Sequence, residues 1–174
     1  MTTKNLRLSK SIIGQNEAIA VSKILLEDGY LGMGGEVGSL EADIATYLGV
    51  GPANVVCVSS GTSALHLAVE ALVNPGEEVL VPSFTYLSSY QAISAARAIP
   101  VSCDIYEDTL TIDVEDAVSK ISPNTKAIMP VHYASNTASL EKIFEIARKF
   151  NLRIIEDAAH AFGCSFKSQK IGSF

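Results

Sequence analysis

Two acidic residues and a histidine stand close together in the segment Glu156-Asp157-Ala158-Ala159-His160. The segment directly follows Arg153 to Ile155, which is typical of a short strand. Carboxylates at the end of a strand are costly to bury unless a charged or hydrogen-bonding partner meets them. A protonated heterocyclic nitrogen would be such a partner for Asp157. The alternative is that Asp157 caps a following turn and that His160 is a surface or supporting residue.

The segment Ser59-Ser60-Gly61-Thr62-Ser63-Ala64 has the composition of an anion-binding turn, and it opens into helical periodicity. A glycine turn at a helix N-terminus offers backbone N–H groups and a favourable dipole to a phosphate, and Thr62 and Ser63 add hydroxyl donors. The pattern is neither G-x-G-x-x-G nor the Walker sequence, so a dinucleotide or a nucleoside triphosphate is not the expected ligand. The alternative is a plain Ser/Thr N-cap.

Aromatic residues follow another expected strand, in Pro82-Ser83-Phe84-Thr85-Tyr86. A flat cofactor ring would find a stacking partner there. The alternative, which is the commoner case for aromatic residues, is that Phe84 and Tyr86 close the top of the core. His132-Tyr133 follows a further strand, and its histidine could either hold a loop or contact a ligand. The three histidines lack the spacing of metal ligands, and no Ser-His-Asp order stands out.

The elements that position these residues alternate between short apolar runs and amphipathic helices. The expected strands are Val55 to Val58, Glu78 to Val81, Ile99 to Cys103, Lys126 to Val131 and Arg153 to Ile155. The expected helices between them are Ser63 to Val73, Ser88 to Arg97, Val114 to Ser119 and Leu140 to Phe150. Such alternation predicts an α/β fold, a three-layer αβα sandwich whose mostly parallel sheet has helices on both sides. Ligands bind at the carboxyl ends of the strands in such sheets, where the polar segments above are found.

A helical segment precedes this pattern. Residues Gln15 to Leu26 show helical spacing, with Gly14 as a plausible N-cap and Glu17 three residues later. A glycine cluster follows and predicts a loop, and then Val37, Leu40, Ile44 and Leu48 mark one face of a short helix. We therefore expect an N-terminal helical segment with a Gly-rich loop over residues 1–50 and an α/β domain over residues 51–174.

Composition excludes several classes of protein. A net charge of −6 and a pI near 5.0 argue against a nucleic-acid partner, which would require clustered Lys and Arg. The cysteines Cys57, Cys103 and Cys164 lack zinc or redox spacing, so we expect reduced thiols in a cytoplasmic protein. The beginning MTTKNLRLSKS has no apolar signal segment, and no run is long enough for a membrane span.

Taken together and in order, these segments resemble the DegT/DnrJ/StrS family of sugar aminotransferases, which depend on pyridoxal 5'-phosphate (PLP) and have the aspartate aminotransferase fold type I. The resemblance covers about Gly14 to Phe174 and rests on four fragments, each weak alone. They are Ser60-Gly61-Thr62-Ser63-Ala64-Leu65, Pro75-Gly76-Glu77-Glu78-Val79 leading to Pro82-Ser83-Phe84-Thr85-Tyr86, Pro130-Val131-His132-Tyr133 and Glu156-Asp157-Ala158-Ala159-His160-Ala161.

The resemblance implies that residues 51–174 are the N-terminal part of the PLP-binding large domain. It assigns the PLP phosphate to Gly61, Thr62 and Ser63, ring stacking to Tyr86, the pyridine nitrogen to Asp157 and the vicinity of the phenolic oxygen to His160. The implied reaction moves an amino group from an amino acid, usually glutamate, to a keto group of a nucleotide-linked sugar for polysaccharide or secondary-metabolite biosynthesis. The implied assembly is a homodimer.

In this family a lysine forms a Schiff base with PLP and shuttles the proton. Its family position follows a Gly-Asp step that would come after Phe174, whereas Lys167 and Lys170 belong to an expected β-hairpin turn. We therefore expect these 174 residues to lack the lysine and to be inactive alone. Glycines usual in the family are replaced by Ser135 and Ser168, which bears on loop geometry.

Two alternatives stay open at this point. One is a PLP-dependent sugar dehydratase of the same family, in which histidine takes the place of the lysine. The other is a non-catalytic remnant that binds PLP weakly or pairs with a full-length homologue.

Overall fold

The computed structural model describes residues 11–174. Residues 1–10, where the sequence predicts no apolar signal segment, lie outside this part. The helices are α1 (Gln15–Lys23), α2 (Gly35–Leu48), α3 (Gly61–Leu72), α4 (Leu87–Ala95), α5 (Val114–Ser119) and α6 (Leu140–Phe150). A π-helical turn (Ile24–Asp28) and two 3₁₀ turns (Pro52–Asn54 and Tyr133–Ser135) supplement them. The strands are β1 (Glu78–Pro82), β2 (Ile99–Cys103), β3 (Thr125–Ile128), β4 (Arg153–Ile154), β5 (Ser165–Phe166) and β6 (Gln169–Lys170).

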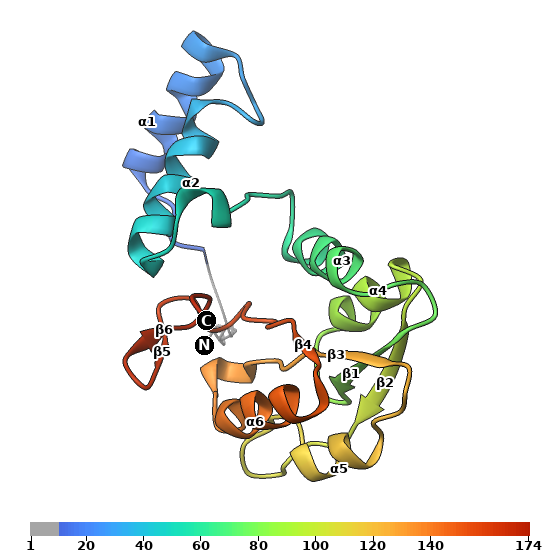
Figure 1. Ribbon diagram of the computed structural model, residues 1–174. Helices are drawn as coiled ribbons and strands as arrows, with labels where there is room; N and C mark the ends of the chain where they lie inside the picture. Colours follow the sequence, from blue (N-terminus) through green and yellow to red (C-terminus); the bar gives the residue numbers. More distant parts are fainter. Residues whose placement is uncertain (1–10) are drawn as a thin grey trace, which may run out of the picture.

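The centre of the fold is a four-stranded sheet in the order β2-β1-β3-β4, with every pairing parallel. Alternate side chains of β1 enter different cores, because successive residues of a strand point to opposite faces. Val79 and Val81 pack in one core with residues of α3 and α4. Leu80 packs in the other with residues of α5 and α6. The predicted three-layer α/β sandwich with a parallel sheet is therefore confirmed (Figure 1).

The direction of each connection explains which face each helix covers. The chain passes from β1 through α4 to its neighbour β2, then through α5 back across β1 to β3, and onward through α6 to β4. Parallel crossovers are right-handed, so connections running in opposite directions along the sheet place their helices on opposite faces. This accounts for α4 on one face and for α5 and α6 on the other.

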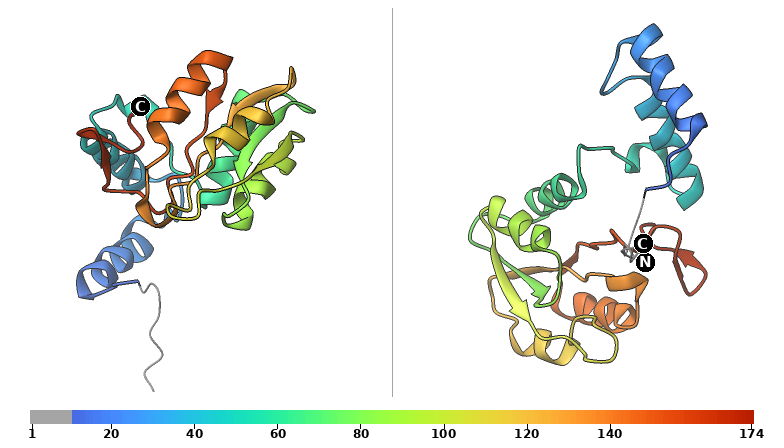
Figure 2. Two further views of the ribbon diagram at one scale, coloured as in Figure 1. Left: turned by 90° about the horizontal axis from the view of Figure 1, so that it is seen from below. Right: turned by 180° about the vertical axis from the view of Figure 1, so that it is seen from behind.

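The N-terminal helical segment is present, and it projects away from the sheet (Figures 1 and 2). The expected cap of α1 is also found, because the N–H of Gly14 donates to Oε2 of Glu17 at 2.7 Å. Apolar residues on these helices, among them Ile19, Leu26 and Leu40, are exposed.

One expected strand is absent from the described residues. Val55 to Val58 runs as an extended segment without strand pairing, and Val56 is 74% exposed. A strand exists only where a neighbour accepts its backbone hydrogen bonds, and here the N–H of Cys57 instead donates to the Glu41 carboxylate at 2.7 Å. The apolar composition of this run was therefore an insufficient signal.

The expected hairpin is confirmed by the antiparallel pair β5 and β6. Its two turn residues, Lys167 and Ser168, have φ angles of 47° and 66°. Two consecutive positive φ angles are the geometry of a two-residue type I′ turn. Ser135, the other position at which the sequence resemblance implies glycine, also has a positive φ, of 68°.

Candidate functional site

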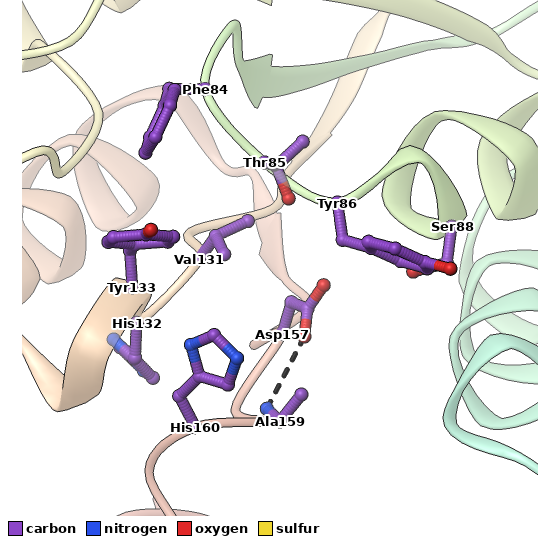
Figure 3. A pocket seen from close by; sticks show the side chains of 10 residues that line it. All are labelled: Phe84, Thr85, Tyr86, Ser88, Val131, His132, Tyr133, Asp157, Ala159 and His160. Atoms are coloured by element: carbon purple, nitrogen blue, oxygen red, sulfur yellow. Dashed lines mark hydrogen bonds between the residues drawn. The ribbon is translucent and has the colours of Figure 1, made fainter. Parts of the chain in front are cut away.

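A cavity of about 380 Å³ opens where the chain leaves the carboxyl ends of β1, β3 and β4. Its lining comes from the β1–α4 loop, the segment after β3 and the segment after β4 (Figure 3). The residues are Phe84, Thr85, Tyr86, Ser88, Val131, His132, Tyr133, Asp157, Ala159 and His160. The volume lies within the range of small-molecule sites. Three residues predicted from the sequence, Tyr86, Asp157 and His160, are thus brought together.

Asp157 is fixed by the continuation of the sheet beyond its regular strands. Its N–H donates to the carbonyl oxygen of Pro130 at 2.9 Å, and its own carbonyl oxygen accepts from the N–H of His132 at 3.1 Å. These bonds form an isolated parallel bridge between Val131 and Asp157. The backbone of Asp157 is therefore hydrogen-bonded on both sides of its peptide units as in a parallel strand, although it lies past the end of β4.

The carboxylate of Asp157 is buried, with 8% of the residue exposed. It accepts from Ser89 Oγ at 2.9 Å and, more weakly, from the N–H of Ala159 at 3.4 Å. Within residues 11–174 it makes no ion pair with a basic side chain. Because a buried carboxylate is costly without a positive partner, the site suits a ligand that brings a cation to Asp157.

The neighbouring acid has a partner of its own. Glu156 Oε2 lies 3.0 Å from Nε2 of His132, whose side chain is 2% exposed. The two successive acids therefore have different environments, one paired within the protein and one directed to the cavity. The sequence left open whether His132 holds a loop or contacts a ligand. In the structure it pairs with Glu156 at the strand end and also lines the cavity.

His160 and Tyr86 lie on either side of Asp157 in Figure 3. Nδ1 of His160 accepts from the N–H of Ala134 at 3.3 Å, so a neutral His160 carries its proton on Nε2 and can donate from there. Its ring also meets Tyr133 edge to face, with centroids 5.7 Å apart. Tyr86 is 79% exposed, so its ring is available to a flat ligand.

The predicted phosphate cradle lies outside the residues that line this cavity. Gly61 begins α3, and Ser60 is its N-cap, with Oγ accepting from the N–H of Ser63 at 3.1 Å. The Ser N-cap that the sequence offered as an alternative is therefore present. It leaves Thr62 exposed, and a Cβ added at Gly61 would meet nothing within 4 Å. The turn is accessible to an anion, since a helix N-terminus retains free N–H groups beyond its cap.

Neither hairpin lysine is part of the cavity. Lys170 Nζ donates to the Tyr47 hydroxyl at 2.9 Å, and Lys167 pairs with Glu141. The ten lining residues include no lysine.

In residues 11–174, no group of three or more His, Cys, Asp or Glu could bind a metal ion, and no helix there is long and apolar enough to cross a membrane.

Sequence reasoning missed Ser89 and gave no role to Ser88 or Ala159. Ser89 is fully buried beneath the cavity and bonded to Asp157. No local signal marked it, because its partner Asp157 lies 68 residues away in the sequence.

The sequence model of the DegT/DnrJ/EryC1/StrS aminotransferase family matches residues 12–174. Among solved structures, the aminotransferase TlmJ from Streptoalloteichus hindustanus is 36% identical, with a TM-score of 0.86 over 93% of this chain and 44% of that one. Spr1654 from Streptococcus pneumoniae, a candidate sugar aminotransferase in its PLP form, is 30% identical, with a TM-score of 0.88 over 98% of this chain and 47% of that one. The sugar aminotransferase CalS13 from Micromonospora echinospora is also 30% identical, with a TM-score of 0.85 over 95% of this chain and 46% of that one. The chain spans less than half the length of each.

Proposed function

Because the chain belongs to the DegT/DnrJ/EryC1/StrS aminotransferase family, we propose that it forms the cofactor-binding part of a PLP-dependent sugar aminotransferase. The observation that carries this proposal is the buried carboxylate of Asp157, which faces the cavity without a basic partner in the described residues. A protonated pyridine nitrogen supplies the missing positive charge. The PLP form of Spr1654 supports the identity of the cofactor.

We assign the cofactor contacts as follows. Asp157 pairs with the ring nitrogen, Tyr86 stacks on the ring, and His160 donates from Nε2 to the phenolic oxygen. Gly61, Thr62 and Ser63 at the start of α3 hold the phosphate. The bound cofactor supplies an electron sink for the carbanion at the amino carbon. Asp157 keeps the ring nitrogen protonated and so maintains that sink.

The substrates that we propose are an amino-acid donor such as glutamate and a keto sugar linked to a nucleotide. CalS13 is described as a sugar aminotransferase, which favours amino transfer over the dehydration that the sequence left open. Because no lysine of residues 11–174 lines the cavity, we propose that the 174 residues alone do not catalyse amino transfer. Amino transfer by this chain with a keto sugar and glutamate would disprove that part.

Cofactor binding can be tested with pyridoxamine 5'-phosphate, which has no aldehyde and cannot react with surface lysines. We expect saturable binding in calorimetry and weaker binding of pyridoxamine, which lacks the phosphate. Asp157→Ala should lower the affinity at least about tenfold, since hydrogen bonds to charged groups contribute roughly 1.5–3 kcal/mol. Asp43→Ala on α2 removes the same charge from an exposed position and should bind as the unmodified chain does. Equal affinity of the two variants would refute the proposal.

We further propose that the whole enzyme is a cytoplasmic homodimer. The three cysteines are free thiols, which suits a reducing compartment. Exposed apolar residues on α1 and α2 offer a surface for a second copy. Sedimentation equilibrium tests the assembly, and a monomer at all concentrations would count against it.

A further inference from the structure

A chain of two hydroxyl groups leads from the wall of the cavity to the buried side of Asp157. Thr85 Oγ1 lies 2.8 Å from Ser89 Oγ, which lies 2.9 Å from Asp157 Oδ2. The directions of these bonds follow from chemistry, because an ionised carboxylate has no proton to donate. Ser89 therefore donates its hydroxyl proton to Asp157, and Thr85 must donate to Ser89.

The two ends of this chain belong to elements far apart in the sequence. Thr85 lies in the β1–α4 loop and Ser89 in the first turn of α4, whereas Asp157 follows β4, and 68 residues separate Ser89 from Asp157. Ser89 is completely buried. Its position is further fixed by its N–H, which donates to the carbonyl oxygen of Tyr86 at 3.1 Å. The first turn of α4 thus holds the carboxylate from beneath, while the β1–α4 loop that precedes it presents Thr85 and Tyr86 to the cavity.

The carboxylate of Asp157 is held at both oxygens. Ser89 donates to Oδ2 and the N–H of Ala159 donates to Oδ1, and the second of these bonds is long. Two donors on different oxygens restrict rotation about the bond to the carboxyl group. Each oxygen still has acceptor capacity for a third donor.

We propose that Ser89, oriented by Thr85, is a positioning residue that sets the carboxylate plane of Asp157 for the cofactor ring nitrogen. The inference rests on the proposed function, because it assumes that Asp157 meets that nitrogen. The pre-set carboxylate avoids reorientation when the cofactor binds, which preserves the full strength of the charged hydrogen bond.

A pair of ligands separates positioning from general structural support. Pyridoxamine 5'-phosphate carries the ring nitrogen, and its carba analogue has a C–H in that place. Calorimetry gives the affinity ratio of the two ligands for each variant. Ser89→Ala should weaken the binding of pyridoxamine 5'-phosphate about tenfold and the binding of the carba analogue less than about twofold. The ratio of the two affinities therefore falls about fivefold or more. Thr85→Val, which removes the first hydroxyl at similar volume, should lower the ratio in the same direction and by less.

The matched control is Ser139→Ala. Ser139 is also buried, and its hydroxyl bonds Thr111 Oγ1 at 2.7 Å and the carbonyl oxygen of Ile112 at 3.1 Å. Its loss should lower stability without changing the ligand ratio. An unchanged affinity ratio in Ser89→Ala would overturn the inference, whether the binding of both ligands weakens equally or does not weaken at all. A failure of the proposed function looks different, because the unmodified chain would then show no preference for the ligand with the ring nitrogen.

Discussion

The backbone N–H of His132 donates to the carbonyl oxygen of Asp157 at 3.1 Å, beyond the last regular residues of β3 and β4. Through this bond, the segment after β3 determines where the buried acid stands. The His132 side chain reinforces the arrangement by pairing with Glu156 at 3.0 Å. One residue thus supports the site through both its backbone and its imidazole.

We expect His132→Ala to lower the free energy of unfolding by about 3 kcal/mol, because it leaves the largely buried Glu156 unpaired and opens a cavity. Glu156→Gln retains a hydrogen-bonding partner and should lose about 1 kcal/mol. Urea unfolding followed by circular dichroism measures both. A loss below about 0.5 kcal/mol for His132→Ala would show that the pair contributes nothing to stability.

Acid should weaken a surface cluster at the start of α5. Hydrogen bonds from Tyr106 and Lys142 lower the pKa of Glu115 to about 2. A lowered pKa stabilises the folded state above the ordinary value of about 4.3, and this contribution fades as the pH falls toward 2. Glu115→Gln should therefore lower the urea midpoint at pH 7. The difference from the unmodified chain should shrink between about pH 4 and pH 2, which is the range between the ordinary and the lowered pKa of Glu115. A difference that is constant with pH would contradict this.

Ser168→Gly should stabilise the chain by about 0.5–1 kcal/mol, because Ser168 has a φ of 66° in the β5–β6 turn and glycine adopts this conformation without strain. Ser165→Gly is the matched control. It places glycine in the extended strand β5, where it should destabilise by a similar amount. Thermal unfolding of the two variants should move in opposite directions.

Val56→Lys should change the free energy of unfolding by less than about 0.5 kcal/mol, since Val56 is exposed in the unpaired segment. Val79→Lys places the same side chain in the core of β1 and should prevent folding. Circular dichroism distinguishes the two results. Strong destabilisation by Val56→Lys would show that Val55 to Val58 is paired after all.

Elements with complete local signals could be predicted from the sequence. The bounds of α5 and α6 were found as expected, because Asp113 caps the first by accepting from two N–H groups and the second has a strongly one-sided apolar pattern. The strand at Val55 to Val58 was wrong, because pairing depends on a neighbour that the local sequence does not reveal.

The residues of the candidate site likewise include some that the sequence could predict and one that it could not. Asp157, Tyr86 and His160 could be located because they follow strands, and the sheet gathers strand ends at one edge. Ser89 could not, because it belongs to the helical sequence LSSYQAISA, where small and polar residues give little contrast between faces. Its importance comes from Asp157, 68 residues away, and that contact is a property of the packed chain.

The strand order β2-β1-β3-β4 has a consequence for where a ligand can enter. From β1 the chain departs toward α4 on one face, and from β3 it departs toward α6 on the other, so the two exits diverge. Such a divergence is a topological switch point, and it leaves a crevice between the strand ends. Phe84 to Tyr86 and Val131 to Tyr133 border this crevice. The opening is thus created by the path of the backbone. Substitutions of the side chains that border it should change which ligands it accepts without closing it.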